Sequence, residues 1–294
     1  MKSTISTLVS SGKILISDGA WGTLLQAKGL QPGECPELWN INYSAEVYEI
    51  AKNYIDAGAD MVETNSFGGN SYKLEPFGLA NKVYEINRKA AEISRKAAGN
   101  DKYVIGSIGP TGKLLMMGDV TEQELYNSYK EQSIALFDGG ADALVIETMT
   151  DLDEARIAIK AARENTSCEV ICTMTFDRTL QGEYRSMMGV SPTEMVNALI
   201  DAGAHVIGAN CSNGIEGMIT ITEEIRLINK TIPILIHANA GMPIYNDGIT
   251  VFPETPEMMA SFVPTLVKAG ANIIGGCCGT TPLHIQKMAE TLGR

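Results

Sequence analysis

The hydrophobic and polar positions of the chain form a pattern that repeats four times. The repeats are IDAGADMVETNSF, FDGGADALVIETMT, IDAGAHVIGANCS and VKAGANIIGGCCG, and they begin at residues 55, 137, 200 and 267. Each contains the end of an amphipathic helix, a Gly-Ala pair where that helix is expected to end, and a short apolar run. Small or polar residues follow each run, so the pattern predicts helix-turn-strand units.

The distance between repeats indicates how many units the chain holds. The Gly-Ala pairs begin at residues 58, 140, 203 and 270, a spacing too long for a solenoid repeat but suited to two strand-helix units per period. The predicted strands are 14–17, 61–64, 103–107, 143–147, 170–175, 206–209, 233–238 and 272–275. The predicted helices are 45–57, 81–98, 121–138, 153–164, 192–202, 216–229, 256–269 and 282–292.

Eight apolar strands that alternate with eight helices are typical of a parallel sheet covered by helices. Eight units within 294 residues favour a closed (β/α)8 TIM barrel over an open doubly wound sheet. No linker-like stretch or charge block divides the sequence, so we predict one domain over residues 1–294. In such a barrel the active site lies at the C-terminal ends of the strands.

Composition and charge narrow the classes of partner. The chain is 45% hydrophobic with a net charge of -12, which argues against nucleic acid and against an anionic membrane surface. No apolar run approaches the roughly 18 residues of a membrane span, and the first residues lack a secretory segment. We therefore expect a cytoplasmic protein that binds neither nucleic acid nor membranes.

Three of the six cysteines follow predicted strands that lie near each other in the barrel. Cys211 follows the sixth strand, and the pair Cys277-Cys278 follows the eighth. Only the seventh strand separates them, so the two strand ends are expected to lie roughly 10 Å apart, within reach of their side chains. The glycines at 275, 276 and 279 allow the backbone to leave strand geometry, so that both sulfurs of the pair can turn the same way.

Three thiolates without an obvious fourth protein ligand are typical of a catalytic zinc site with an open position. Zn²⁺ with three thiolates has a net charge of -1, so it polarises carbonyls weakly but can bind a substrate thiol as thiolate. This favours alkylation of a thiol over hydrolysis. A vicinal disulfide of the pair and a purely structural role remain as alternatives. Cys168 and Cys172 are interpreted as core residues, and Cys35 as structural or part of a lid.

The positions of the three histidines indicate less about function than those of the cysteines. His205 follows a Gly-Ala pair, so we interpret it as structural at the bottom of the barrel, and His284 as a capping or supporting group in the last helix. His237 ends the strand between the two cysteine-bearing strands, where it could approach a metal ion.

Seven motifs, in order along almost the whole chain, resemble the homocysteine S-methyltransferase family, and most closely the homocysteine-binding module of cobalamin-dependent methionine synthase. They are DGAWGT (18–23), ETNSF (63–67), GPTG (109–112), ET (147–148), GANCS (208–212), HANAGMP (237–243) and GGCCGTTPLHI (275–285). The last of these, with the upstream Asn-Cys pair, is highly specific.

The resemblance implies methyl transfer to homocysteine, giving methionine, on a (β/α)8 barrel with one zinc ion. It implies that Cys211, Cys277 and Cys278 are the zinc ligands and that Glu147 meets the substrate ammonium group. The remaining residues implied in substrate binding are Asp18 and Gly19 of the first motif, the backbone at Ser66 and Phe67 for the carboxylate, and Asn239.

Whole methionine synthase continues into folate, cobalamin and activation domains, whereas this sequence ends at Arg294. We therefore expect an external methyl donor, either methylcobalamin on a corrinoid partner protein or methyltetrahydrofolate, with a folate-binding protein as a further possible partner. Transfer involving another thiol or thioether, and a non-catalytic homocysteine-binding module, remain as alternatives. Residues 31–40 are interpreted as a donor-facing lid in preference to a packed loop.

Overall fold

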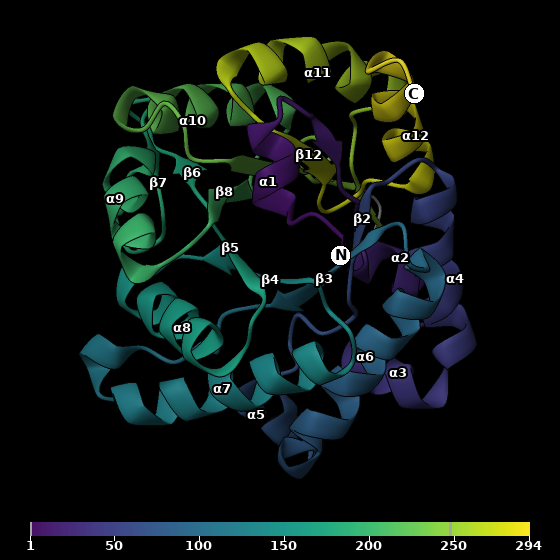
Figure 1. The fold of residues 1–294 in the computed structure, drawn as a ribbon, viewed down its shortest axis with the longest axis vertical. Helices are drawn as coiled ribbons and strands as arrows, with labels where there is room; N and C mark the ends of the chain where they lie inside the picture. The colour runs from purple at the N-terminus through teal and green to yellow at the C-terminus, as the bar shows by residue number, and fades with distance from the viewer. Residues whose placement is uncertain (1, 247–248) are drawn as a thin grey trace.

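The computed structural model describes residues 2–246 and 249–294. Eight parallel strands form one sheet in the order β1-β12-β9-β8-β5-β4-β3-β2, and helices surround it as a ring (Figure 1). The strands are β1 (Leu15–Ile16), β2 (Met61–Glu63), β3 (Tyr103–Ile108), β4 (Ala143–Met149), β5 (Glu169–Met174), β8 (Val206–Asn210), β9 (Ile234–Ala238) and β12 (Ile273–Gly276). This architecture confirms the predicted (β/α)8 barrel.

The outer helices coincide closely with the predicted ones. They are α4 (Ser44–Asp56), α6 (Val83–Ala98), α7 (Glu122–Asp138), α8 (Leu152–Asn165), α9 (Pro192–Ala202), α10 (Ile215–Ile228), α11 (Pro256–Ala269) and α12 (Pro282–Thr291). The glycines of the four Gly-Ala pairs all have left-handed φ values, between 101° at Gly58 and 119° at Gly270. Each following alanine donates its N–H back into the last helical turn, as Ala59 does to Tyr54 O at 3.2 Å.

Several short elements lie in the loops and are absent from the sequence prediction. The helices are α1 (Ile5–Ser10), α2 (Gly22–Ala27), α3 (Trp39–Asn42) and α5 (Ser71–Leu74), and the 3₁₀ turns are Pro36–Leu38, Glu75–Phe77, Ala80–Lys82 and Leu115–Met117. Two hairpins pair β6 (Asp177–Arg178) with β7 (Tyr184–Arg185) and β10 (Ile244–Asn246) with β11 (Ile249–Val251). Segments of two to six residues carry too little periodicity to be recognised.

Aspartates join the sheet between its first and last strands, where regular strand pairing stops. The Asp60 N–H donates to Ile16 O at 2.7 Å, and its side chain accepts from the Ile16 N–H at 2.9 Å. Nearer the mouth, the Asp18 carboxylate accepts from the Glu63 N–H at 2.8 Å. These contacts link β1 to β2, so carboxylates complete the barrel where the backbone ladder does not.

The barrel interior changes from apolar to polar along the strands. The part nearer the N-terminal ends of the strands is filled by inward-facing residues of all eight strands, among them Leu15, Met61, Val145 and Leu235, all buried in one cluster. The inward positions two residues further on include Ser17, Glu63, Glu147 and His237, because side chains of a strand alternate between faces. Polar groups therefore gather at the C-terminal end of the barrel.

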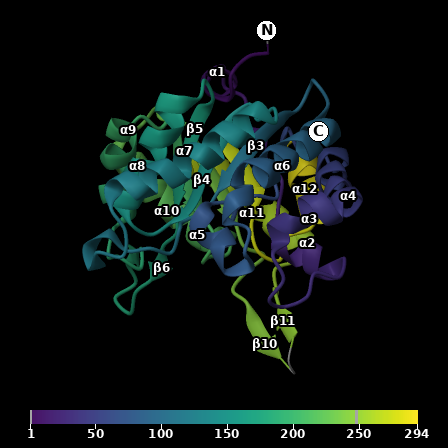
Figure 2. The ribbon, with the colours of Figure 1, turned by 90° about the horizontal axis from the view of Figure 1, so that it is seen from below.

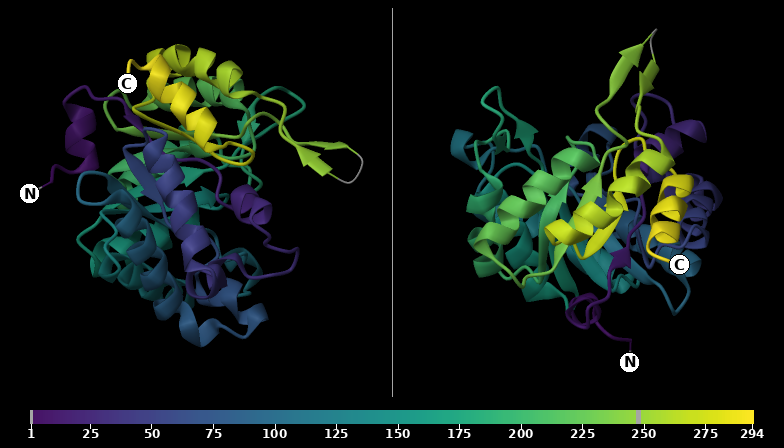
Figure 3. Two further views of the ribbon diagram at one scale, coloured as in Figure 1. Left: turned by 90° about the vertical axis from the view of Figure 1, so that its right-hand side faces the viewer. Right: turned by 90° about the horizontal axis from the view of Figure 1, so that it is seen from above.

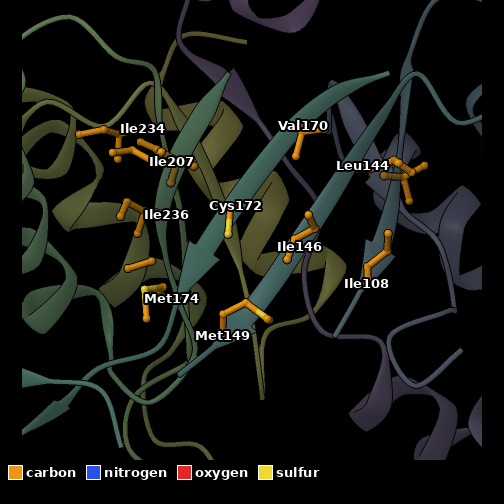
Figure 4. Packing of buried hydrophobic residues seen from close by; sticks show 14 of the residues in the cluster. Ile108, Leu144, Ile146, Met149, Val170, Cys172, Met174, Ile207, Ile234 and Ile236 are labelled. Carbon is orange, nitrogen blue, oxygen red and sulfur yellow. The ribbon is translucent and has the colours of Figure 1, made fainter. Parts of the chain in front are cut away.

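The outward faces of the strands pack against the surrounding helices. Figure 4 shows this layer, in which Ile146, Cys172 and Ile207 lie with other apolar residues of the largest core cluster. Cys172 is fully buried there and Cys168 is almost fully buried, which confirms their interpretation as core residues. Continuous apolar strands are required because one face fills the barrel and the other contacts helices.

Helix α1 closes the N-terminal end of the barrel. Its residues Ile5 and Val9 belong to the interior cluster, and Glu169 accepts hydrogen bonds from the N–H groups of Ile5 and Ser6 at 2.6 and 3.2 Å. The hairpin β10–β11 projects from the opposite end (Figures 2 and 3). The described part of the chain contains no helix with the length and apolar character needed to cross a membrane.

Candidate active site at the mouth of the barrel

Three sulfur atoms lie together at the C-terminal end of the barrel. Cys211 follows β8, Cys277 and Cys278 follow β12, and the three Sγ atoms all lie within 4.8 Å of one another. The Sγ atoms of Cys211 and Cys278 are 3.9 Å apart. All three cysteines are free thiols, so the structure contains no vicinal disulfide. Sulfurs about 3.8 Å apart are what tetrahedral coordination at a Zn–S length of about 2.3 Å requires, so this group can hold a metal ion.

The backbone on each side turns sharply to bring these sulfurs together. Cys211 and Ser212 have φ values of 62° and 58°, a left-handed conformation that is costly for residues other than glycine. Hydrogen bonds hold this turn, from the Cys211 N–H to His237 O at 3.0 Å and from the Asn213 N–H to Cys211 O at 2.7 Å. Strained backbone next to a candidate ligand is typical of a functional site.

The second turn uses glycine. Gly276 still belongs to β12, and Gly279 supplies the left-handed residue with a φ of 81°. The Cys277 N–H donates to Ala238 O at 2.7 Å, and the Thr280 N–H donates to Cys277 O at 3.1 Å. A Cβ on Gly276 would lie 2.3 Å from the Thr280 hydroxyl, so the close packing of this turn also requires glycine.

The three sulfurs share negative charge unequally. Hydrogen bonds from Cys277 and Cys278 lower the pKa of Cys211 to about 3. The pKa of Cys278 is raised to about 12, first through its hydrogen bond to Cys211, and the pKa of Cys277 is raised well above its usual value in the same way. One sulfur is therefore readily an anion, whereas three thiolates at this distance need a cation among them.

None of the described histidines belongs to this group of candidate ligand atoms. His237 is only 2% exposed and lies against Glu63, with its Nδ1 3.4 Å from Glu63 Oε1. His284 forms a capping box with Thr281 at the start of α12, which confirms its capping role. His205 accepts from the Val170 N–H at 2.9 Å, near the N-terminal end of β5, which confirms a structural position.

A cavity of about 370 Å³ opens beside the sulfurs. Its wall comes from the loops after several strands and from residues 36–37. The lining residues are Gly19, Ala20, Trp21, Gly22, Thr23, Leu25, Pro36, Glu37, Glu63, Thr64, Asn65, Ser66, Phe67, Ser107, Glu147, Thr148, Cys211, His237, Gly276, Cys277 and Cys278. The cavity therefore brings the sulfurs together with Gly19, Ser66, Phe67 and Glu147, the residues predicted from their motifs.

Glu147 is buried in this wall and held by two neighbours. The Ser107 hydroxyl donates to its Oε1, and Asn210 Nδ2 donates to its Oε2 at 3.2 Å. Burial raises the pKa of Glu147 to about 7, and the hydrogen bond from Ser107 opposes part of that effect. Each oxygen can accept a further hydrogen bond, and Glu147 lines the cavity, so the carboxylate is placed to accept from a ligand.

Asp18 lies behind the cavity wall and is fully buried. Its Oδ2 accepts from the Trp21 indole N–H at 2.9 Å and from the Glu63 N–H at 2.8 Å, while its Oδ1 accepts from the Ser17 hydroxyl at 3.2 Å. Burial raises the pKa of Asp18 to about 6. The structure therefore places Asp18 where it fixes β1, β2 and Trp21, next to the cavity.

Gly19 and Asn239 occupy different positions relative to the cavity. Gly19 lines it, and a Cβ there would lie 2.5 Å from the Thr280 hydroxyl, so this close approach requires glycine. Asn239 is not a lining residue; it is buried close to Cys211, where its side chain helps to lower the pKa of that thiol.

The turn at residues 64–68 presents a backbone donor to the cavity. The Ser66 N–H already donates to Thr64 O at 2.8 Å, whereas the Phe67 N–H has no hydrogen-bond partner among the described residues. Glu37 accepts from the Gly68 N–H at 2.7 Å and holds the turn from the other side. Phe67 lines the cavity, so its free N–H is a candidate donor for a ligand.

Residues 35–40 form a packed wall in place of a loose lid. The Asn40 amide donates to Asn65 O at 2.8 Å, and the Asn65 amide donates to Pro36 O at 2.8 Å. Cys35 is buried and its thiol donates to Glu37 at 3.4 Å. In this structure the segment is fixed to the loop after β2, which supports the packed-loop interpretation of residues 31–40.

Three polar residues of the site were not predicted. Ser107, Asn210 and Glu63 are all buried near the ends of strands. Ser107 and Glu63 lie two residues beyond the apolar interior positions Ile105 and Met61, and Asn210 lies four residues beyond Val206. This alternation is the signal by which the sequence identifies them, because inward positions near the strand ends must face the mouth. Their contacts depend on neighbouring strands and become visible only in the fold.

The site thus defines a barrel protein with a sulfur-rich candidate metal centre beside an acidic cavity, and comparisons with known proteins agree. The family model for homocysteine S-methyltransferases matches residues 15–292. Methionine synthase from Mycobacterium tuberculosis (strain ATCC 25618 / H37Rv) is 31% identical over 304 residues, and that from Mycobacterium leprae (strain TN) is 30% identical over 298 residues. These alignments cover 97% and 96% of this chain but 25% and 24% of the relatives, so the chain spans about a quarter of their length.

The homocysteine methyltransferase MmuM from Escherichia coli, in its metallated form, has the same fold. It superposes with a TM-score of 0.78 at 22% identity, over 97% of this chain and 98% of that one. The chain belongs to the homocysteine S-methyltransferase family.

Proposed function

We propose that this chain transfers a methyl group from an external donor to the thiol of homocysteine, giving methionine, with zinc held by Cys211, Cys277 and Cys278. The observation that carries the proposal is the position of three sulfurs within 4.8 Å of one another, beside a cavity that also contains Glu147. Membership of the family supports homocysteine as the methyl acceptor.

The three candidate metal ligands fit zinc better than other common metals. Three thiolates favour soft or borderline ions, and no described carboxylate or imidazole belongs to the group of candidate ligand atoms. When bound, zinc would supply its charge to stabilise the substrate sulfur as thiolate at a pH where a free thiol remains protonated. Asn239 supports this set because its side chain helps to lower the pKa of Cys211.

The chain's own residues would bind and orient the amino acid. Glu147 accepts hydrogen bonds from the ammonium group. The Phe67 N–H, which follows Ser66 in the turn at residues 64–68, donates to the carboxylate. Asp18 holds this side of the site in place through Trp21 and the Glu63 backbone. Fixing both ends of the substrate directs its sulfur to the cysteines, which is how positioning contributes to rate.

The chemical step exchanges one bond for another. The substrate thiol loses its proton to solvent and its sulfur attacks the donor methyl group. An S–CH₃ bond forms, and the bond between the methyl group and the donor breaks with its electron pair remaining on the donor. Trp21, Leu25 and Phe67 contribute apolar surface to the cavity wall and keep water from the nucleophile. The thioether product is neutral and has no proton to lose, so it leaves readily.

The donor is proposed to be methylcobalamin on a corrinoid partner protein or methyltetrahydrofolate, with a folate-binding protein as a possible partner. The mouth of the barrel supports delivery by a protein, because large apolar side chains are exposed on the loops after β3, β5 and β9. They are Met116, Met117, Leu180, Met187, Met242 and Tyr245, each more than half exposed. A cytoplasmic location belongs to the same proposal, since free thiols at the site need a reducing compartment.

Parallel assays would test this function. Zinc-loaded protein and homocysteine are incubated with methylcobalamin, methyltetrahydrofolate, betaine and S-methylmethionine, and methionine is measured; methanethiol replaces homocysteine in a second set. Methionine from at least one donor is the expected result. Turnover only with another thiol would assign a different acceptor, and tight homocysteine binding without turnover by any donor would indicate a binding module.

A further inference from the structure

Glu63 is a buried carboxylate on the cavity wall whose side chain lacks hydrogen bonds. It is 7% exposed at the end of β2, and its Oε1 has no hydrogen-bond partner among the described residues. His237 Nδ1 lies 3.4 Å from this oxygen, and His237 Nε2 is also without a partner among the described residues. Two adjacent buried polar side chains with unmet hydrogen-bonding capacity, both lining one cavity, point to a ligand that supplies the missing donor.

The backbone of Glu63, by contrast, is fixed on both sides. Its N–H donates to Asp18 at 2.8 Å, and its carbonyl accepts from the Ser94 hydroxyl at 2.8 Å. The side chain is therefore held at the cavity by a rigid strand end while its carboxylate remains unsatisfied. Among the three buried acids at this end of the barrel, Asp18 already accepts three hydrogen bonds and Glu147 accepts two.

The charges around the cavity select a cationic ligand. Its lining includes Glu37, Glu63 and Glu147, and no lysine or arginine is among the described residues that line it. Burial raises the pKa of Glu63 well above its usual value, and the nearby charges of Glu147 and Asp18 raise it further.

We propose that Glu63 is a second substrate-binding carboxylate, which accepts from the ammonium group of the amino acid together with Glu147, and that His237 is its positioning residue. This inference rests on the proposed function, because it takes an α-amino acid thiol as the ligand. An ammonium group offers three N–H donors, so it can meet Glu147 and Glu63 at once. Asp18 then acts through Glu63, by fixing the strand end that carries it.

If Glu63 had a purely structural role, its replacement would change the stability of the protein. A buried carboxylate that stabilises the fold needs hydrogen bonds, and an unpaired one costs free energy. Replacement by the isosteric amide should therefore not lower the Tm of the ligand-free protein, whereas it should weaken binding of the ammonium group. Loss of affinity without loss of stability distinguishes a binding residue from a structural one.

The test compares two thiols on zinc-loaded protein by isothermal titration calorimetry. L-homocysteine carries the ammonium group. In 4-mercaptobutyrate the thiol and the carboxylate are the same, but a hydrogen atom replaces the ammonium group. We expect wild type to prefer homocysteine. In Glu63→Gln the affinity for homocysteine should fall about 10- to 100-fold, the range for a lost hydrogen bond to a charged group, while that for 4-mercaptobutyrate stays within about twofold.

Glu223→Gln, which changes an exposed glutamate on α10, serves as the matched control and should bind both ligands as wild type does. If Glu63→Gln loses affinity equally for both ligands, or for neither, the inference about Glu63 is wrong while the proposed function still stands. A wild-type protein that does not bind homocysteine would overturn the proposed function and this inference with it. If Glu63→Gln fails to fold, His237→Gln tests the same pair: a severalfold smaller preference for homocysteine is expected, and an unchanged preference contradicts the proposal.

Discussion

Asn210 Nδ2 donates to Glu147 Oε2 at 3.2 Å, and the next residue along the chain is Cys211. The same side chain donates to the Thr148 hydroxyl at 2.7 Å and accepts from the Thr148 N–H at 2.8 Å. Thr148 has a φ of 59°, so the amide of Asn210 stabilises a strained turn next to Glu147. One buried residue therefore joins the proposed ammonium site to the first candidate zinc ligand.

Replacement of Asn210 by alanine should weaken both parts of the site. Loss of its hydrogen bonds frees the Glu147 carboxylate and the Thr148 turn, so we expect kcat/KM for homocysteine to fall about 10- to 100-fold, mostly through KM. Steady-state kinetics on zinc-loaded protein measure this. Asn53→Ala, at an exposed position of α4, is the control. Kinetics equal to wild type in Asn210→Ala would show that Asn210 does not position Glu147.

Substitution of a candidate zinc ligand should remove the metal and the activity together. In Cys277→Ser we expect the zinc content to fall well below one ion per chain and turnover to fall more than about 100-fold, because two thiolates hold zinc more weakly than three. Metal analysis and the methionine assay measure both quantities. Cys172→Ala, in the core layer, should retain zinc and activity. Normal turnover of metal-free Cys277→Ser would refute the zinc mechanism.

The six thiols should fall into two classes of three. Cys35, Cys168 and Cys172 are buried, whereas Cys211, Cys277 and Cys278 are partly exposed. In metal-free native protein we expect three thiols to react with Ellman's reagent, Cys211 first because its pKa is lowered to about 3, and six after unfolding. Zinc should protect the reactive three. Rapid reaction of all six in the native state would contradict the described burial.

Glu147 should make stability depend on pH. Its pKa is raised from 4.5 to about 7, mainly by burial, so its contribution is fully present below pH 4.5 and is lost as pH rises through 7. Relative to Glu147→Gln, which does not titrate, the free energy of unfolding of metal-free wild type should fall over this interval by up to roughly 3 kcal/mol. Urea unfolding at several pH values measures it, with Glu223→Gln as control. A difference between wild type and Glu147→Gln that does not change with pH would show that the carboxyl is not buried as described.

Gly208 should tolerate no side chain. A Cβ at this position in β8 would lie 1.8 Å from the Leu235 carbonyl oxygen of β9, so Gly208→Ala must push the two strands apart just before Cys211. We expect a loss of stability of about 3 kcal/mol or more, the size typical of severe overpacking. Thermal unfolding measures it. Gly22→Ala meets no atom within 4 Å and should leave the Tm nearly unchanged.

The sequence by itself determined the barrel and its eight units. Continuous apolar strands, amphipathic helices and the Gly-Ala pairs are local signals, and the position of a residue at a strand end follows from them. This is sufficient to place Cys211, Cys277, Cys278 and Glu147 at the mouth of the barrel. The family motifs then indicated their chemistry, since each motif lies at such a strand end.

Only the tertiary structure decided which of these side chains meet the cavity and which support it. Asp18 lies behind the wall while Glu63 and His237 line it, although all three occupy strand ends in the sequence. Residues 35–40 pack as a wall because Asn40 and Asn65 exchange hydrogen bonds across a gap of 25 residues. The physical reason is that these contacts join different strands and loops, whose side chains meet only once the barrel has closed and fixed their registers.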